Sequence, residues 1–187
     1  SSGNSRNFVA LRLSFFALRP DTHFPHSPHF LATDRAATVS RMLIYGPTLD
    51  EMLHPETIDP ALRKRAREAL EKDPLSALNL YNITWKGQDN RVRHLVLPHE
   101  LTGIEAEIVV MLGRFFPTGS HKVGATYSCC IERQVRGQVQ PGKHRLVWPS
   151  TGNYGIGGAY VGPRMGYDSL VILPEEMSQE RFDWLKS

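Results

Sequence analysis

Lys122 is the side chain in this sequence whose surroundings most clearly suggest chemistry. It lies in the segment 117–125, which reads PTGSHKVGA and separates a predicted strand from a predicted helix. Loop-forming residues precede it, so Lys122 falls in the first helical turn, where the positive end of the helix dipole disfavours an ammonium ion. A neutral lysine amine is a nucleophile that forms Schiff bases with carbonyl compounds. The segment therefore predicts a reactive lysine, and a surface lysine or a phosphate-binding lysine is the alternative.

A second segment, residues 149–159, has the composition of an anion-binding loop. It reads PSTGNYGIGGA and lies between a predicted strand that ends at Trp148 and a Gly- and Ala-rich predicted helix. The side chains of Ser150, Thr151 and Asn153 stand where backbone amides at a helix N-terminus are free to donate hydrogen bonds. Such a combination binds a carboxylate or a phosphate.

Two nucleotide-binding motifs fit these segments poorly. A Walker A loop requires Gly-Lys-Ser/Thr, whereas here His121 precedes the lysine and Val123 follows it. A dinucleotide-binding G-x-G-x-x-G that starts at Gly155 would need glycine at position 160, where Tyr160 stands. The second motif is disfavoured and the first is excluded.

Alternating strands and helices must position both segments. We expect a helix at 60–72 with Asp59 as its N-cap, a strand at 91–97 and a buried strand at 107–112. Further along the chain, the pattern predicts helices at 120–135, 154–165 and 178–186 and strands at 144–148 and 169–173. This alternation predicts an α/β fold in which right-handed βαβ units build a parallel sheet.

Together, the two segments resemble the fold-type II pyridoxal-phosphate-dependent enzymes. This family includes the tryptophan synthase β chain, cysteine synthase, threonine synthase and the serine/threonine dehydratases. Residues 117–125 are most similar to the tryptophan synthase β chain, and residues 150–159 are more similar to cysteine and threonine synthases. Residues 174–181, which read PEEMSQER, resemble the cysteine synthase stretch after the next strand. The three motifs occur in family order and span about residues 107–186.

The resemblance implies a cofactor, pyridoxal 5′-phosphate, and a role for each site residue. Lys122 would bind the cofactor covalently and later move the α-proton of the substrate, and His121 would lie near the cofactor phosphate. Asn153 would donate a hydrogen bond to the 3′-oxygen of the cofactor. The substrate carboxylate would be held by the loop residues Ser150, Thr151, Gly152 and Asn153. No metal site is implied.

The expected reaction is β-replacement or β-elimination on a small serine- or cysteine-like amino acid. Ser150 stands where the tryptophan synthase β chain has a catalytic glutamate, which argues against indole chemistry. The family's Gly-rich phosphate cup lies in a C-terminal half that this sequence lacks, so we expect a fragment that is inactive alone. We expect the complete enzyme to be a homodimer. The alternative is a truncated, non-catalytic α/β domain that binds small anions or a partner chain.

The chain divides into three predicted parts. Residues 1–41 form a disordered or non-native arm ahead of Met42, with an organelle-targeting peptide as the alternative. Residues 42–100 form a mainly irregular N-terminal extension with a helix and a strand, and residues 101–187 form a partial catalytic α/β domain. Because its sheet would stop early, we expect an exposed apolar edge at residues 171–173.

Composition bounds the remaining possibilities. The 187 residues are 41% hydrophobic and 22% charged, which excludes a mainly disordered chain and a disulfide scaffold. The formal charge of +3 comes from residues 1–41, so a nucleic-acid partner is not expected. Nor is a membrane partner, because no apolar run is long enough to cross a bilayer.

The cysteines and three histidines complete the expectations. Cys129 and Cys130 are adjacent, and we expect two reduced thiols in a helix of a cytoplasmic protein. His23, His26 and His29 recur at every third position, but no cysteine or acidic side chain completes a metal shell there.

Overall fold

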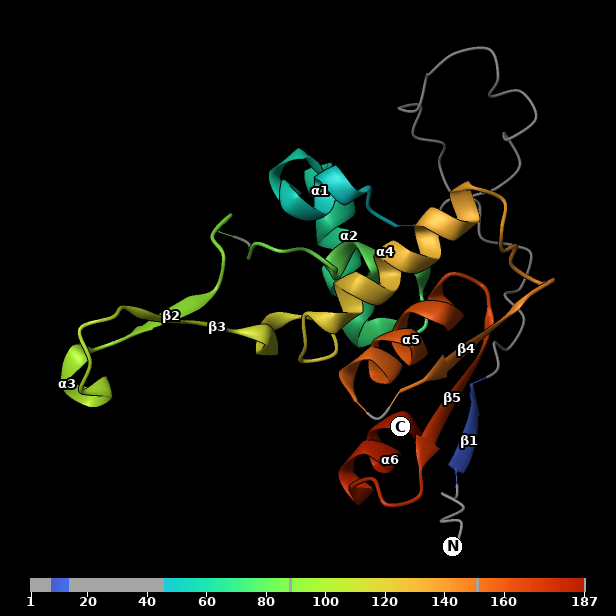
Figure 1. Cartoon of the computed structure of the whole chain (residues 1–187). Coiled ribbons are helices and arrows are strands. Elements are labelled where there is room, and N and C mark those ends of the chain that lie inside the picture. Colours follow the sequence, from blue (N-terminus) through green and yellow to red (C-terminus); the bar gives the residue numbers. More distant parts are fainter. Residues whose placement is uncertain (1–7, 14–45, 88, 151, 187) are drawn as a thin grey trace, which may run out of the picture.

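The computed structural model describes residues 8–13, 46–87, 89–150 and 152–186 (Figure 1). The strands are β1 (Phe8–Leu13), β2 (His94–Leu97), β3 (Ile108–Met111), β4 (Arg145–Pro149) and β5 (Asp168–Pro174). The α-helices are α1 (Leu49–Leu53), α2 (Pro60–Lys72), α3 (His99–Thr102), α4 (Lys122–Val135), α5 (Asn153–Arg164) and α6 (Gln179–Lys186). Three short 3₁₀ helices are η1 (Pro55–Thr57), η2 (Ala77–Asn82) and η3 (Gly113–Phe115). The three regularly spaced histidines, His23, His26 and His29, lie outside the described residues.

The β4–α5–β5 segment forms the βαβ unit that the sequence predicts. Strands β4 and β5 are parallel, with Trp148 opposite Val171, and α5 connects them. The helix packs closely on the sheet because glycines face it: a Cβ at Gly158 would overlap the Trp148 ring, and one at Gly162 would overlap the Ser169 side chain. Among the described residues, β4 and β5 are the one parallel pair, so the parallel sheet that the sequence predicts is present only in part.

The sequence predicts an exposed apolar edge at residues 171–173, and this prediction is wrong. Strand β5 lies between β4 and β1, and β1 pairs with it in antiparallel orientation. The side chains of Val171 and Leu173 are buried. The sequence does not predict a strand at residues 8–13, because pairing with a strand more than 150 residues away leaves no local pattern.

Buried tyrosines connect the N-terminal extension to the α/β unit. Tyr127 of α4 donates a hydrogen bond to the Pro47 carbonyl at 2.6 Å, and Tyr160 of α5 donates one to the Asn79 carbonyl at 3.3 Å. Burial raises the pKa of Tyr160 to about 12, so its hydroxyl stays protonated at neutral pH. Residues 46–87 therefore pack against α4 and α5 as part of one core.

The predicted strand at 107–112 exists but is neither buried nor part of the parallel sheet. Strand β3 pairs in antiparallel orientation with β2, with His94 opposite Met111, and the short helix α3 connects them. The two strands and α3 project from the body of the molecule (Figure 1). Met111 is 62% exposed and Val109 is 49% exposed. A run of four apolar residues does not distinguish a buried parallel strand from this exposed hairpin.

The adjacent cysteines are free thiols in a helix, as the sequence predicts, but their environments differ. Cys129 is exposed and Cys130 is buried, and burial raises the pKa of the Cys130 thiol to about 12. Thiolate is the reactive form.

We expect a disulfide reagent such as DTNB at mildly alkaline pH to modify one thiol in the folded chain and two after unfolding. The variant Cys129→Ser should not react with DTNB while it is folded. Rapid reaction of two thiols without denaturant would show that Cys130 is not protected by burial.

Within the described residues, none of the helices is long and apolar enough to cross a membrane.

Candidate functional site

The reactive-lysine segment forms the entrance to α4. Lys122 is the first residue of the helix, His121 is its N-cap, and both side chains are exposed. The preceding loop is held by its own hydroxyls: Ser120 Oγ accepts from the Lys122 backbone N–H at 3.3 Å, and Thr118 Oγ1 donates to the Ser120 carbonyl at 3.3 Å. The turn at Gly119 has φ of +69°, a conformation that favours glycine. The loop thus holds the Lys122 backbone in place and leaves its amine in solvent.

The predicted anion loop lies at the carboxyl end of β4. The Ser150 N–H donates to the Ile172 carbonyl at 3.3 Å, which extends the pairing with β5, and Ser150 Oγ accepts from the Gly152 N–H at 3.2 Å. Gly152 is the N-cap of α5, and Asn153 is its first residue. Thr151 lies outside the described residues. Glycine has no side chain to cap the helix, and the Gly155 N–H donates to the Gly152 carbonyl at 3.0 Å, so the Asn153 and Tyr154 amides are the ones that an anion could reach.

Contact between α4 and α5 brings the two predicted segments together. A Cβ at Gly157 would lie 2.7 Å from Thr126 Oγ1 and 3.2 Å from the Lys122 carbonyl oxygen. Only glycine fits there, and its absent side chain lets the second turn of α5 touch the first turn of α4. Asn153 lies about one turn, or roughly 5.4 Å, back along α5. The first turn of α4 therefore contacts α5 about one turn away from Asn153.

Arg181 lies beside the anion loop, although the sequence motifs did not point to it as a candidate site residue. Its Nη1 atom lies 3.2 Å from the position that a Cβ would take at Gly152, so a guanidinium group adjoins the anion loop. It is the third residue of α6. A basic side chain in the first turn of a helix opposes the helix dipole, and this is the signal that also singled out Lys122. The position of Arg181 in the first turn of a predicted helix could therefore have marked it as an unusual cation from the sequence.

Tyr154 anchors the start of α5. Its ring packs edge-on against Trp148 of β4, with the ring centroids 5.6 Å apart. Burial, together with a hydrogen bond to the Cys129 thiol, raises the pKa of Tyr154 to about 12. The hydroxyl is therefore neutral at physiological pH, and the ring fixes the direction in which α5 leaves the loop.

The donors at this site fit pyridoxal phosphate. Its aldehyde needs an accessible primary amine, which Lys122 offers at the surface of α4. The 3′-oxygen and the phosphate of the cofactor need hydrogen-bond donors. The Asn153 amide, the His121 imidazole and the N-terminus of α5 can supply them. Among the described residues, no three His, Cys, Asp or Glu side chains are arranged to hold a metal ion.

No family model matches the chain. The chain is 37% identical over 91 residues to a cystathionine beta-synthase of Saccharomyces cerevisiae, which covers 49% of this chain and 18% of that protein. It is 35% identical over 82 residues to a probable cysteine synthase of Bacillus subtilis, covering 44% of this chain and 26% of that protein. A cystathionine beta-synthase of Dictyostelium discoideum is 34% identical over 84 residues, which is 45% of this chain and 17% of that protein.

The matches thus span about a fifth to a quarter of the relatives' length. They agree with the resemblance that the motifs carry. Over about half of its length, this chain is homologous to cystathionine beta-synthase and cysteine synthase, which are fold-type II pyridoxal-phosphate-dependent enzymes.

Proposed function

We propose that this chain carries the lysine side of an active site for pyridoxal-phosphate-dependent β-replacement or β-elimination on a serine- or cysteine-like amino acid. The observation that carries the proposal is the contact at Gly157, which joins the helix that begins with Lys122 to the helix that begins with Asn153. The names of the homologues, cysteine synthase and cystathionine beta-synthase, support β-replacement at this coarse level.

Each residue then has a defined task. The cofactor, when bound, supplies an electron sink for the substrate Cα. Lys122 would hold the cofactor through its Nζ atom, and the same atom, once free as an amine, would accept the proton from the substrate Cα. His121 donates to the phosphate group. The Asn153 side-chain amide donates to an oxygen on the cofactor ring, which fixes the orientation of the ring relative to α5.

The substrate carboxylate would be bound by the loop at the start of α5. The residues are Ser150, Thr151, Gly152 and Asn153, and the Arg181 guanidinium adds positive charge beside Gly152. Backbone amides at a helix N-terminus bind a carboxylate without needing a charged side chain. Binding through the carboxylate leaves the Cβ substituent of the amino acid free to depart or to be replaced.

The carboxylate site can be tested with two substitutions. In the chain loaded with pyridoxal phosphate, Asn153→Ala and Arg181→Gln should each weaken the binding of serine, cysteine and O-acetylserine. A lost hydrogen bond to a charged group costs about 1.5–3 kcal/mol, which corresponds to a rise of about ten- to hundredfold in the dissociation constant. The readout is the change in the visible absorbance of the cofactor during titration, and Asn153→Ala should also shift the starting spectrum.

Lys186→Gln is the matched control, because it removes one positive charge from the exposed far end of α6. Its dissociation constants should equal those of the unchanged chain. If Arg181→Gln and Lys186→Gln weaken binding equally, Arg181 acts only through net charge. If small carboxylates bind but the chain never captures pyridoxal phosphate, it is a non-catalytic anion-binding domain instead.

A further inference from the structure

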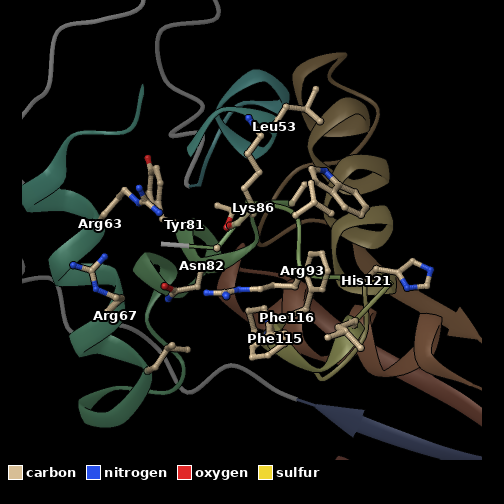
Figure 2. Close-up of a pocket in the computed structure, with 18 of the residues that line it drawn as sticks. Leu53, Arg63, Arg67, Tyr81, Asn82, Lys86, Arg93, Phe115, Phe116 and His121 are labelled. Carbon is tan, nitrogen blue, oxygen red and sulfur yellow. The ribbon is translucent and has the colours of Figure 1, made fainter. Parts of the chain in front are cut away.

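A cavity of about 780 Å³ lies beside the reactive-lysine segment and is distinct from the anion loop. Figure 2 shows α2, with Arg63 and Arg67, on one side of it and Phe115, Phe116 and His121 on the other. Its volume is that of a small-molecule site. Among the described residues, His121 lines it, whereas Lys122, Ser150, Gly152 and Asn153 do not, so most of the cavity lies outside the cofactor site proposed above.

The cavity is lined by more positive than negative charge. Arg63 and Arg67 lie one turn apart on the same face of α2, and Lys86 and Arg93 also reach the cavity. Among the described residues that line it, Glu71 is the one acidic side chain.

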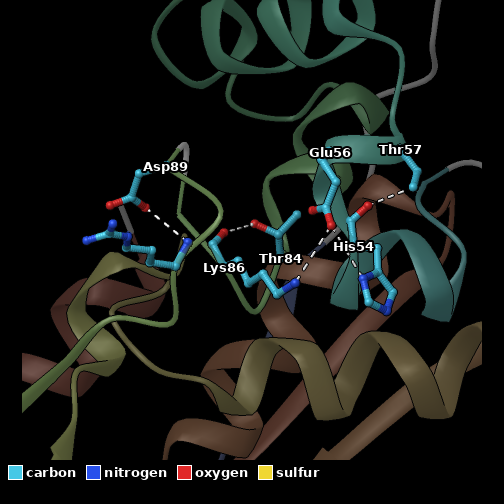
Figure 3. A network of polar contacts seen from close by, with 7 residues as sticks. His54, Glu56, Thr57, Thr84, Lys86 and Asp89 are labelled. Atoms are coloured by element: carbon cyan, nitrogen blue, oxygen red, sulfur yellow. Dashed lines mark hydrogen bonds and ion pairs between the residues drawn. The ribbon is translucent and has the colours of Figure 1, made fainter.

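Two of these four cations are already neutralised. The Lys86 ammonium lies 3.7 Å from Glu56, which also contacts His54, as Figure 3 shows. The Arg93 guanidinium lies 3.3 Å from Asp89.

Arg63 and Arg67 differ from that pair. Within the part of the chain that the structure describes, neither has an ion-pair partner at 4.0 Å or less. Like charges four residues apart on a helix repel each other. Two neighbouring guanidinium groups that face a cavity without counterions are therefore matched to a ligand with two negative charges.

Aromatic side chains form another part of the cavity lining. Trp85 and Phe116 pack edge to face, with ring centroids 5.4 Å apart, and Tyr81 also lines the cavity. Phe115 is 55% exposed, and the Arg93 guanidinium lies 5.3 Å from its ring centroid. Exposed aromatic rings beside cations favour a ligand with a flat apolar part.

We propose that this cavity binds an organic anion in which an aromatic body is joined to a phosphate monoester or a similar doubly charged group. The charged group contacts Arg63 and Arg67, and the aromatic body lies against Phe115 and Phe116. A phosphate monoester carries close to two negative charges at neutral pH, which matches the two guanidinium groups.

Calorimetric titration with 1-naphthyl phosphate tests the proposal. The double variant Arg63→Gln/Arg67→Gln should raise its dissociation constant about tenfold or more. The matched control is Lys64→Gln/Arg65→Gln, which removes the same charge from exposed positions of α2 that do not line the cavity. This control should leave the dissociation constant nearly unchanged. Inorganic phosphate, which lacks the ring, and 1-naphthol, which lacks the charge, should both bind more weakly than 1-naphthyl phosphate.

Several outcomes would overturn the proposal: equal weakening by both double variants, naphthol binding as tight as the phosphate ester, or no binding of the ester at all. Should the arginine variant fail to fold, Phe115→Ala removes an exposed ring and should weaken the ester but not inorganic phosphate. The measurement needs no pyridoxal phosphate, so its result is independent of the proposed function. Borohydride-fixed cofactor on Lys122 should leave the affinity unchanged, whereas loss of binding would assign the cavity to the cofactor site.

Discussion

Replacing Lys122 with alanine is expected to abolish the covalent capture of pyridoxal phosphate by this chain. Covalent capture requires an accessible primary amine beside groups that hold the rest of the cofactor. Lys122 is exposed at the start of α4, and the contact at Gly157 brings its backbone against α5 about one turn from the first residue of that helix. The expected effect is complete loss, because no other group at this site is an amine. The measurement is intact mass after incubation with the cofactor and reduction with borohydride.

Lys143→Ala is the appropriate control for this experiment. Lys143 is also exposed, and it lies in the turn before β4, where no helix N-terminus provides a phosphate site. This variant should gain the mass of one cofactor, as the unchanged chain does, and peptide mapping should place the adduct on Lys122. An adduct of undiminished yield in Lys122→Ala, or one mapped to Lys86, would show that the lysine assignment is wrong.

The sequence predicts best the elements whose ends are set by local chemistry. Helix α2 begins at Pro60 because the Asp59 side chain accepts a hydrogen bond from the Leu62 N–H at 2.9 Å, and it ends before Pro74. The predicted bounds of β4, α5 and β5 differ from the structure by one residue at each end. In each case, glycine, proline or a capping side chain marks the end of an element within a few residues of sequence.

Pairing between distant segments could not be predicted in the same way. The apolar run in β3 is compatible with a parallel sheet or with a hairpin, and the ten-residue connection through α3 allows the antiparallel pairing with β2. The pairing of β1 with β5 and the cavity beside α2 both depend on tertiary packing. No single segment contains the information that Arg63 of α2 and Phe115 of η3 line one cavity.

The candidate site could be predicted from the sequence only in part. The positions of Lys122 and Asn153 at the first residues of two helices follow from the loop residues before them. The contact that makes them neighbours does not, because it depends on Gly157 meeting Thr126 across a helix interface. The role of Arg181 depends in the same way on the placement of α6 beside Gly152.

Gly158→Ala is expected to destabilise the βαβ unit strongly. Its Cβ would overlap the indole of Trp148, which is itself buried, so α5 and β4 would have to separate. Alanine is favoured over glycine within a helix by about 1 kcal/mol, and this gain opposes the clash. Overpacking a core costs about 1–3 kcal/mol, occasionally more, and an overlap with a rigid ring lies at the upper end. We expect a net loss of about 2 kcal/mol in the free energy of unfolding, measured by urea denaturation.

A double-mutant cycle with Trp148→Leu separates this clash from other effects of the substitution. Leucine is smaller than tryptophan, and the indole Nε1 is buried without a hydrogen-bond partner among the described residues, so its removal strands no polar group. In the Trp148→Leu chain, Gly158→Ala should cost less than in the unchanged chain, because the added methyl group then fills vacated space. Equal costs in both backgrounds would mean that the indole does not set the spacing between α5 and β4. The spacing matters for the site because the loop that holds Ser150 and Gly152 joins these two elements.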